Sequence, residues 1–262
     1  MLLASSRFAA LLCTLVLAST LFSNSMAAQP DSRCFELRIY TANTGKLADL
    51  HARFRNHTMR IFAKHGITNI GYWVPIENPE QKLVYILAYP SKQAREDSWK
   101  EFQADPEWQK AKAASEEQGP LVAKVESKFM QATDFSPELR PEAAKERRVF
   151  ELRTYLATPG NLERLLTRAR NNTEPLFKAH HITGLAYWTL MPNQPGADKS
   201  LIYFLAHESV EAGEKAFKEL RADPAWIKIK NQSEEEAGGP LTPTQDGIIS
   251  LYLTATDYSP MK

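Results

Sequence analysis

Two short segments of the chain alternate charged or phenolic residues with apolar ones. Their polar members are Glu36, Arg38, Tyr40, Glu151, Arg153 and Tyr155. Because alternate residues of a β-strand point to one face, each segment would set a carboxylate, a guanidinium and a phenol side by side. Arginine can bind an anion through two parallel N–H groups, and glutamate or tyrosine can transfer a proton. The pattern is typical of a binding site for a small organic anion, or of a site for proton transfer.

The same six residues also have a purely structural interpretation. Burying a charge costs several kcal/mol unless the charge is paired, and a planar guanidinium is a good partner for a carboxylate. Glutamate and arginine could then pair within a strand or across a two-fold axis, and so determine strand register. Since the pattern occurs twice, a symmetric structural role explains it at least as well as a single active site. The sequence leaves both interpretations open and assigns no catalytic residue.

Histidine and cysteine give weaker chemical signals. His65 and His180 follow the first predicted helix of each half, and we expect them to bond its last carbonyl groups. His57 is matched by Asn172 in the second half, which argues against a symmetric metal site. No His-x-x-x-His or Cys-x-x-Cys spacing occurs, and Cys34 has no base nearby in the sequence. The sequence therefore predicts neither a metal site nor a cofactor.

Residues 1–27 are predicted to form a secretory signal peptide. This segment has one basic residue, Arg7, and its apolar run over residues 8–22 is too short for an ordinary transmembrane helix. Without it, the 32 basic residues become 31 and balance the 31 acidic ones, so we expect no surface for nucleic acid or anionic lipid. The expected protein is secreted or periplasmic and free of the membrane. It would have no intrachain disulfide, because Cys34 is its one remaining cysteine.

The elements that would position the six polar residues are themselves duplicated. The hexapeptide Phe-Glu-Leu-Arg-x-Tyr at 35–40 returns at 150–155, and Ala-Thr-Asp-aromatic-Ser-Pro ends both halves, at 132–137 and 255–260. Tyr-Trp and Asp-Pro pairs recur between them in the same order. Two copies of one module of about a hundred residues thus follow each other. We predict a first domain at 33–135, a linker at 136–148 and a second domain at 149–260.

Each module predicts the element order β-α-β-β-α-α-β. Phe35, Leu37 and Ile39 alternate with polar residues as in a strand, and Ser91 and Asp105 are suitable N-caps for the second and third helices. This is the ferredoxin-like split β-α-β order with one additional short helix, and its helices cover one face of the sheet. The other face of the sheet has no helices and must be covered by another layer of structure. We therefore predict an α+β fold in which two tandem modules form an intrachain pseudo-two-fold α+β barrel.

The opening Phe-Glu-Leu-Arg-x-Tyr strand, the Gly-led helix after it, and the Trp-bearing third helix after Asp-Pro resemble the NIPSNAP family. The resemblance covers both modules. It implies membership of the larger dimeric α+β-barrel group, whose known members include cofactor-independent monooxygenases and haem-degrading enzymes. For the NIPSNAP branch itself it implies a fold and a barrel interior, and no particular reaction.

Three hypotheses about function follow. The first is an exported NIPSNAP-like protein that binds a small organic ligand, or a partner, within or around the barrel. The second is a cofactor-independent monooxygenase or isomerase acting on a small aromatic or quinone-like compound in the barrel interior. The third is a structural module whose outer helices make a homo-oligomer. The first two place the six polar residues inside the barrel, which requires the apolar side of the first strand to pack under the helices.

Overall fold

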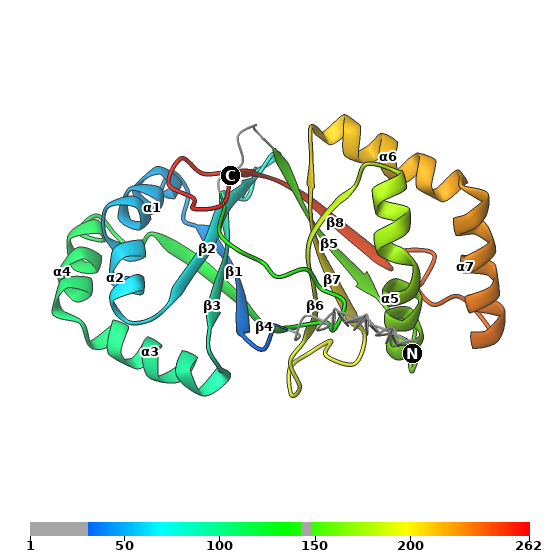
Figure 1. Cartoon of the computed structure of the whole chain (residues 1–262). Helices are drawn as coiled ribbons and strands as arrows, with labels where there is room; N and C mark the ends of the chain where they lie inside the picture. Colours follow the sequence, from blue (N-terminus) through cyan, green and yellow to red (C-terminus); the bar gives the residue numbers. More distant parts are fainter. Residues whose placement is uncertain (1–30, 143–147) are drawn as a thin grey trace, which may run out of the picture.

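The structure is a computed structural model that describes residues 31–142 and 148–262. The predicted signal peptide and residues 143–147 of the predicted linker lie outside the described residues. Figure 1 shows two modules whose sheets face each other and whose helices lie on the two outer sides. In the described parts of the chain, none of the helices is both long and apolar enough to span a bilayer.

The two modules contain the same elements in the same order. The first has β1 (Cys34–Ala42), α1 (Leu47–Arg53), a π-helical turn η1 (Phe54–Thr58), α2 (Met59–Lys64), β2 (Thr68–Pro75), β3 (Lys82–Tyr89), α3 (Lys92–Ala104), α4 (Pro106–Ser115) and β4 (Val122–Ala132). The second has β5 (Val149–Leu156), α5 (Leu162–Ala179), β6 (Thr183–Leu190), β7 (Ser200–His207), α6 (Val210–Ala222), α7 (Pro224–Ala237) and β8 (Ile248–Ala255). Together α1, η1 and α2 correspond to α5.

The eight strands close into one antiparallel barrel in the order β1-β3-β2-β8-β5-β7-β6-β4. Within a module, long ladders join the strands; β1, for example, pairs with β3 from Cys34 to Thr41. Between modules, each of two seams has three residue pairs, β2 with β8 and β4 with β6. The prediction of an intrachain α+β barrel built from two tandem ferredoxin-like modules is confirmed.

Apolar side chains fill the barrel interior. Phe35 and Leu37 of β1 join Trp73 and the equivalent residues of the second module in one cluster. The Trp73 ring is fully buried and lies 4.9 Å from the ring of Phe204, edge to face. Leu139, from the segment that follows the first module, is packed into the same cluster. The interior of the barrel is therefore a hydrophobic core.

The prediction that the six polar residues point into the barrel interior is wrong. The structure places them on the outer face of the sheet, beneath the helices; they are Glu36, Arg38, Tyr40, Glu151, Arg153 and Tyr155. The reason is that two sheets that bury each other need apolar faces, because a charge between them would lose its water without gaining a partner. On the helical side such partners are present: Arg95 of α3 pairs with Glu36, and His207 at the end of β7 pairs with Glu151.

The motif that ends each module reaches across to the other module. Asp134 accepts two hydrogen bonds from Arg170 of α5, at 2.7 and 2.9 Å. The Ser136 hydroxyl accepts one from the backbone N–H of Tyr187 in β6, at 2.9 Å. The second copy of the motif makes the equivalent contacts through Asp257, Arg55, Ser259 and Tyr72. We call residues 133–137 and 256–260 the crossing segments.

Polar side chains at the helix ends connect helices to one another. As predicted, Ser91 and Asp105 are the N-caps of α3 and α4 and accept hydrogen bonds from the first turn of each helix. His65 follows α2, but its side chain does not bond the last carbonyl groups as predicted. Its Nε2 lies 2.7 Å from Oδ2 of Asp105, and His180 makes the same contact with Asp223 at 2.8 Å. The N-cap carboxylate is the stronger partner because it is charged and fixed in place.

Candidate functional site

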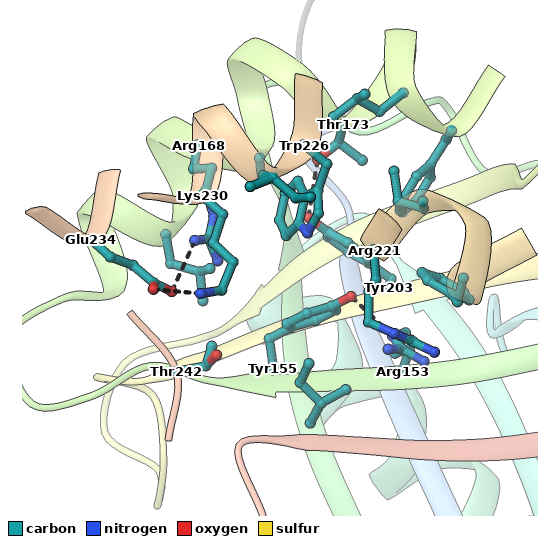
Figure 2. A pocket seen from close by; sticks show the side chains of 18 of the residues that line it. Arg153, Tyr155, Arg168, Thr173, Tyr203, Arg221, Trp226, Lys230, Glu234 and Thr242 are labelled. Carbon is teal, nitrogen blue, oxygen red and sulfur yellow. Dashed lines mark hydrogen bonds and ion pairs between the residues drawn. The ribbon is translucent and has the colours of Figure 1, made fainter. Parts of the chain in front are cut away.

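A cavity of about 420 Å³ lies between the outer face of the second module's sheet and helices α5, α6 and α7. Figure 2 shows this cavity with Arg153 and Tyr155 rising from the sheet and Trp226 descending from α7. Much of the wall is apolar, from Leu165 and Phe217 among others. Cavities of this size, with an apolar wall and a few polar groups, are typical of small-molecule sites.

Smaller side chains surround this cavity than surround the corresponding region of the first module. Ala169 of α5 lines the cavity, and the equivalent position of the first module holds Phe54. Phe54 is buried against the rings of Phe62 and Tyr85. The replacement of a phenylalanine by an alanine leaves space between α5 and the sheet in the second module.

The first module has a cavity of about 560 Å³ in the equivalent place. Arg38, Tyr40 and Trp108 line it, as Arg153, Tyr155 and Trp226 line the other. It extends over residues 123–125, which are exposed at the start of β4, and part of its volume therefore lies on the surface of the protein. The two glutamates of the predicted site line neither cavity and are fully buried behind the arginines; they are Glu36 and Glu151.

Glu36 is the centre of a buried polar cluster. It accepts hydrogen bonds from both Arg38 and Arg95, the latter at 2.9 and 3.0 Å, and from the hydroxyls of Ser127 at 2.7 Å and Tyr89 at 3.1 Å. Burial alone raises the pKa of the Glu36 carboxyl, but the hydrogen bonds from Arg95 and the charge of Arg38 outweigh burial and lower the pKa to about 2. Two permanent cations therefore hold this carboxylate ionised.

Glu151 is neutralised differently. It accepts hydrogen bonds from Arg153 at 2.8 Å and Ser250 at 2.6 Å, and its Oε2 lies 2.9 Å from Nε2 of His207. Burial raises the pKa of this carboxyl, but the hydrogen bond with His207 and the charge of Arg153 outweigh burial and lower it. Gly213 stands where the first module has its second arginine, and a β-carbon there would approach the His207 ring to 3.0 Å.

The two cavity arginines differ in how much of their hydrogen-bonding capacity the protein uses. Arg38 donates from Nε to Tyr85 at 2.8 Å, from Nη1 to Glu36, and from Nη2 to Tyr40 at 3.2 Å. Arg153 donates from Nε to Tyr155 at 2.9 Å and from Nη1 to its glutamate. Among the described residues, nothing accepts a hydrogen bond from its Nη2. Arg153 lines the cavity and is 9% exposed, so this donor is accessible to a ligand there.

A further arginine, absent from the sequence-based prediction, lies at the other end of the cavity. Arg168 of α5 is 8% exposed, and its Nη1 lies 3.6 Å from Oε1 of Glu234 (Figure 2). Burial lowers the pKa of Arg168, and the glutamate offsets this only in part. Its counterpart Arg53 lies closer to Glu116, at 2.7 Å. Both arginines and both glutamates recur at equivalent positions of the two modules, and this recurrence is the signal that could have identified them.

The described residues contain no cluster of three or more histidine, cysteine, aspartate or glutamate side chains that could hold a metal ion. Cys34 is buried, with its Sγ 3.7 Å from Sδ of Met191. Burial raises the pKa of its thiol, which disfavours the thiolate that a nucleophile needs.

A sequence model of the NIPSNAP family matches residues 35–137 and 150–246, which is more than half of the chain and includes both modules. The chain belongs to the NIPSNAP family. The first NIPSNAP segment contains Glu36, Arg38 and Tyr40, and the second contains Glu151, Arg153 and Tyr155. Membership of the family gives this NIPSNAP protein its fold and its repeated module, and assigns no reaction to it.

Solved structures share the fold of this NIPSNAP protein. An anthrone oxidase-like protein has a TM-score of 0.56 and 12% identity, over 86% of this chain and 92% of that chain. A candidate monooxygenase from Lactobacillus acidophilus NCFM has a TM-score of 0.53 and 11% identity, over 88% and 95%. A NIPSNAP family protein of unknown function from Agrobacterium tumefaciens C58 has a TM-score of 0.37 and 24% identity, over 42% and 95%. At these identities the first two show the fold alone. No curated protein matches this chain.

Proposed function

We propose that this NIPSNAP protein binds a small organic ligand in the cavity of the second module, between the sheet and α5 to α7. The observation that carries the proposal is the cavity of about 420 Å³, which is lined by Ala169 where the first module places Phe54. The barrel interior supports the same location, because apolar side chains fill it and the remaining space for a ligand is on the helical side of the sheet. The composition of residues 1–27 supports a secreted or periplasmic place of action.

Filling the cavity tests this proposal. The change Ala169→Phe introduces the ring that the first module has at this position, and we expect it to occupy the space a ligand needs. Native mass spectrometry of the wild-type protein, purified from its source compartment, should detect a bound small molecule. We expect the variant to carry about tenfold less of it, since a phenyl ring in the site removes the volume and the contacts together.

A matched control is Ala179→Phe, which adds the same ring to the exposed end of α5 outside the cavity. It should leave ligand occupancy unchanged. Equal occupancy in the wild-type protein and the Ala169→Phe variant would place the ligand elsewhere, and a wild-type protein that carries no ligand would contradict the proposal.

A cofactor-independent oxygenase or isomerase reaction is the second candidate. It is favoured by Tyr155, which lines the cavity; its hydroxyl oxygen accepts a hydrogen bond from Arg153, so its own proton is available to a ligand. The same purified protein distinguishes the two candidates. A ligand that is recovered unchanged after incubation with dioxygen supports binding alone, and one that is recovered oxidised or rearranged supports catalysis.

A further inference from the structure

Three hydrogen-bond donors without protein acceptors lie in the same cavity. The first is Nη2 of Arg153, and the second is the hydroxyl proton of Tyr155, whose oxygen already accepts from Arg153. The third is the guanidinium of Arg221, which forms no hydrogen bond or ion pair with any residue that the structure describes. Figure 2 shows Arg221 descending from α6 toward the part of the cavity where Arg153 and Tyr155 lie. Such a group of donors can bind an acceptor that enters the cavity.

Positive charge exceeds negative charge around this cavity. Four of the described residues that line it are cationic, namely Arg153, Arg168, Arg221 and Lys230. The one carboxylate among them is Glu234, which Lys230 already binds at 2.7 Å at the opposite end (Figure 2). Behind the sheet surface, Glu151 offsets the charge of Arg153. Among the residues that the structure describes, no carboxylate lies within ion-pair distance of Arg221. The cavity therefore favours an anion.

The first module's cavity is also lined by four cations and one carboxylate, but it has no counterpart of Arg221. Gln103 stands at the position of Arg221, and Arg38 donates from its Nη2 to Tyr40. Its cationic side chain is therefore satisfied within the protein, and the neutral amide adds no charge. Among the described residues that line the first module's cavity, the buried donor without a partner is Nε of Arg53. The group formed by Arg153, Tyr155 and Arg221 belongs to the second module, so it is not a requirement of the shared fold.

Apolar side chains surround the donors and reach the mouth of the cavity. The Phe217 ring lies over the guanidinium of Arg153, with its centroid 4.0 Å away. Ile227 of α7 and Ile248 of β8 line the cavity and are each 44% exposed. An apolar body of a ligand would cover both, while an acidic group on that body could reach the arginines.

We propose that the ligand is an aromatic or otherwise apolar carboxylic acid, whose carboxylate binds Arg153, Arg221 and the Tyr155 hydroxyl and whose apolar body lies against Phe217 and Ile248. This assignment rests on the proposed function, because it names the ligand class of the same cavity. A guanidinium offers a carboxylate two parallel N–H groups, and the apolar body of a bound ligand would shield these hydrogen bonds from water.

The experiment compares an acid with a neutral compound of nearly the same shape. Binding of 2-naphthoate and of 2-naphthamide to the full protein is measured by isothermal titration calorimetry at low salt. We expect the acid to bind at least about tenfold more tightly, because hydrogen bonds to charged groups contribute more than neutral ones. The change Arg221→Gln copies Gln103 and should reduce this preference to about threefold or less, with amide binding unchanged.

Lys218→Gln is the matched control, since it removes one exposed cation from the same helix outside the cavity. It should leave the preference for the acid intact. Arg221 has no protein partner, so its replacement should fold normally, with a melting temperature within about 2 °C of the wild type.

Equal binding of the acid and the amide by the wild-type protein would overturn the carboxylate assignment and leave the proposed function standing. An equal loss in Arg221→Gln and Lys218→Gln would also overturn it, because the preference would then come from net charge alone. If neither probe binds while Ala169→Phe still excludes the co-purified ligand, the ligand class is wrong and the binding cavity is right.

Discussion

Each module buries one glutamate between sheet and helices, and the two modules neutralise it with different partners. Glu36 is held by Arg38 and Arg95, which are cationic at every physiological pH. Glu151 is held by Arg153 and by the imidazole ring of His207. In the first module, the arginine beside the glutamate uses all its nitrogen atoms in hydrogen bonds within the protein. In the second module, one nitrogen of the equivalent arginine has no partner among the described residues and is free for a ligand.

We predict that the change Glu36→Gln makes the protein less stable at pH 7 and that this difference shrinks in acid. The folded pKa of about 2 lies below the ordinary value of 4.5, so ionised Glu36 stabilises the folded state above about pH 4.5. This contribution is lost as the pH falls through 2. Urea unfolding should show the gap between wild type and variant narrowing by about 3 kcal/mol between pH 5 and pH 2.

Glu77→Gln, at an exposed position, serves as the control and should show no such narrowing. A gap between the wild type and Glu36→Gln that stays constant with pH would mean that the carboxylate is not held ionised by its two arginines.

At the scale of the elements, one aspartate connects two helices. Asp105 caps α4 by accepting from the backbone N–H of Glu107 at 2.8 Å, and its other oxygen binds His65 and Lys64 at the end of α2. The hydrogen bonds from these two side chains lower the pKa of Asp105 to about 2. Asp223 repeats the arrangement with His180. The end of α2 is thus bonded to the start of α4, and the end of α5 to the start of α7.

We predict that Asp105→Ala lowers the melting temperature more than Asp105→Asn does. Asparagine keeps an oxygen that can cap α4, whereas alanine removes both the cap and the contact with α2. The expected decrease for alanine is about 2–4 °C, measured by circular dichroism at pH 7. Equal decreases for the two variants would show that the cap contributes little and that the charge of Asp105 provides the stabilisation.

At the scale of the whole molecule, the crossing segments hold two short seams together. Each seam between modules has three residue pairs, which is little for a barrel of eight strands. Tyr258 of the second crossing segment packs against Tyr72 of the first module and hydrogen-bonds His51 at 2.7 Å. Phe135 of the first segment packs against Tyr187 of the second module. This reciprocal exchange makes the two modules one structural unit.

We predict that Ser136→Ala and Ser259→Ala each destabilise the protein by about 1–3 kcal/mol. Each serine hydroxyl accepts from a backbone N–H in the other module, and its loss leaves that buried donor without a partner. The two sites lie at opposite seams, so the double variant should lose roughly the sum in urea unfolding. If the double variant has the same free energy of unfolding as either single variant, the two seams do not contribute independently to stability.

Much of the fold follows from local patterns in the sequence. The duplicated opening strand identifies two modules, and the alternation of Phe35, Leu37 and Ile39 identifies a strand with two distinct faces. Ser91 and Asp105 mark helix starts because a short polar side chain there can satisfy backbone N–H groups of the first turn. These features depend on residues that are neighbours in the chain, so the sequence by itself determined them.

Only the tertiary structure decided which face of each sheet turns inward and where a ligand can enter. Alternation is symmetric, so it separates Leu37 from Arg38 without saying which of them meets the helices. The choice depends on partners distant in the sequence, since Arg95 and His207 on the helical side compensate the buried glutamates. The space beside Ala169, which the Phe54 ring fills in the other module, is likewise a property of packed side chains from several elements.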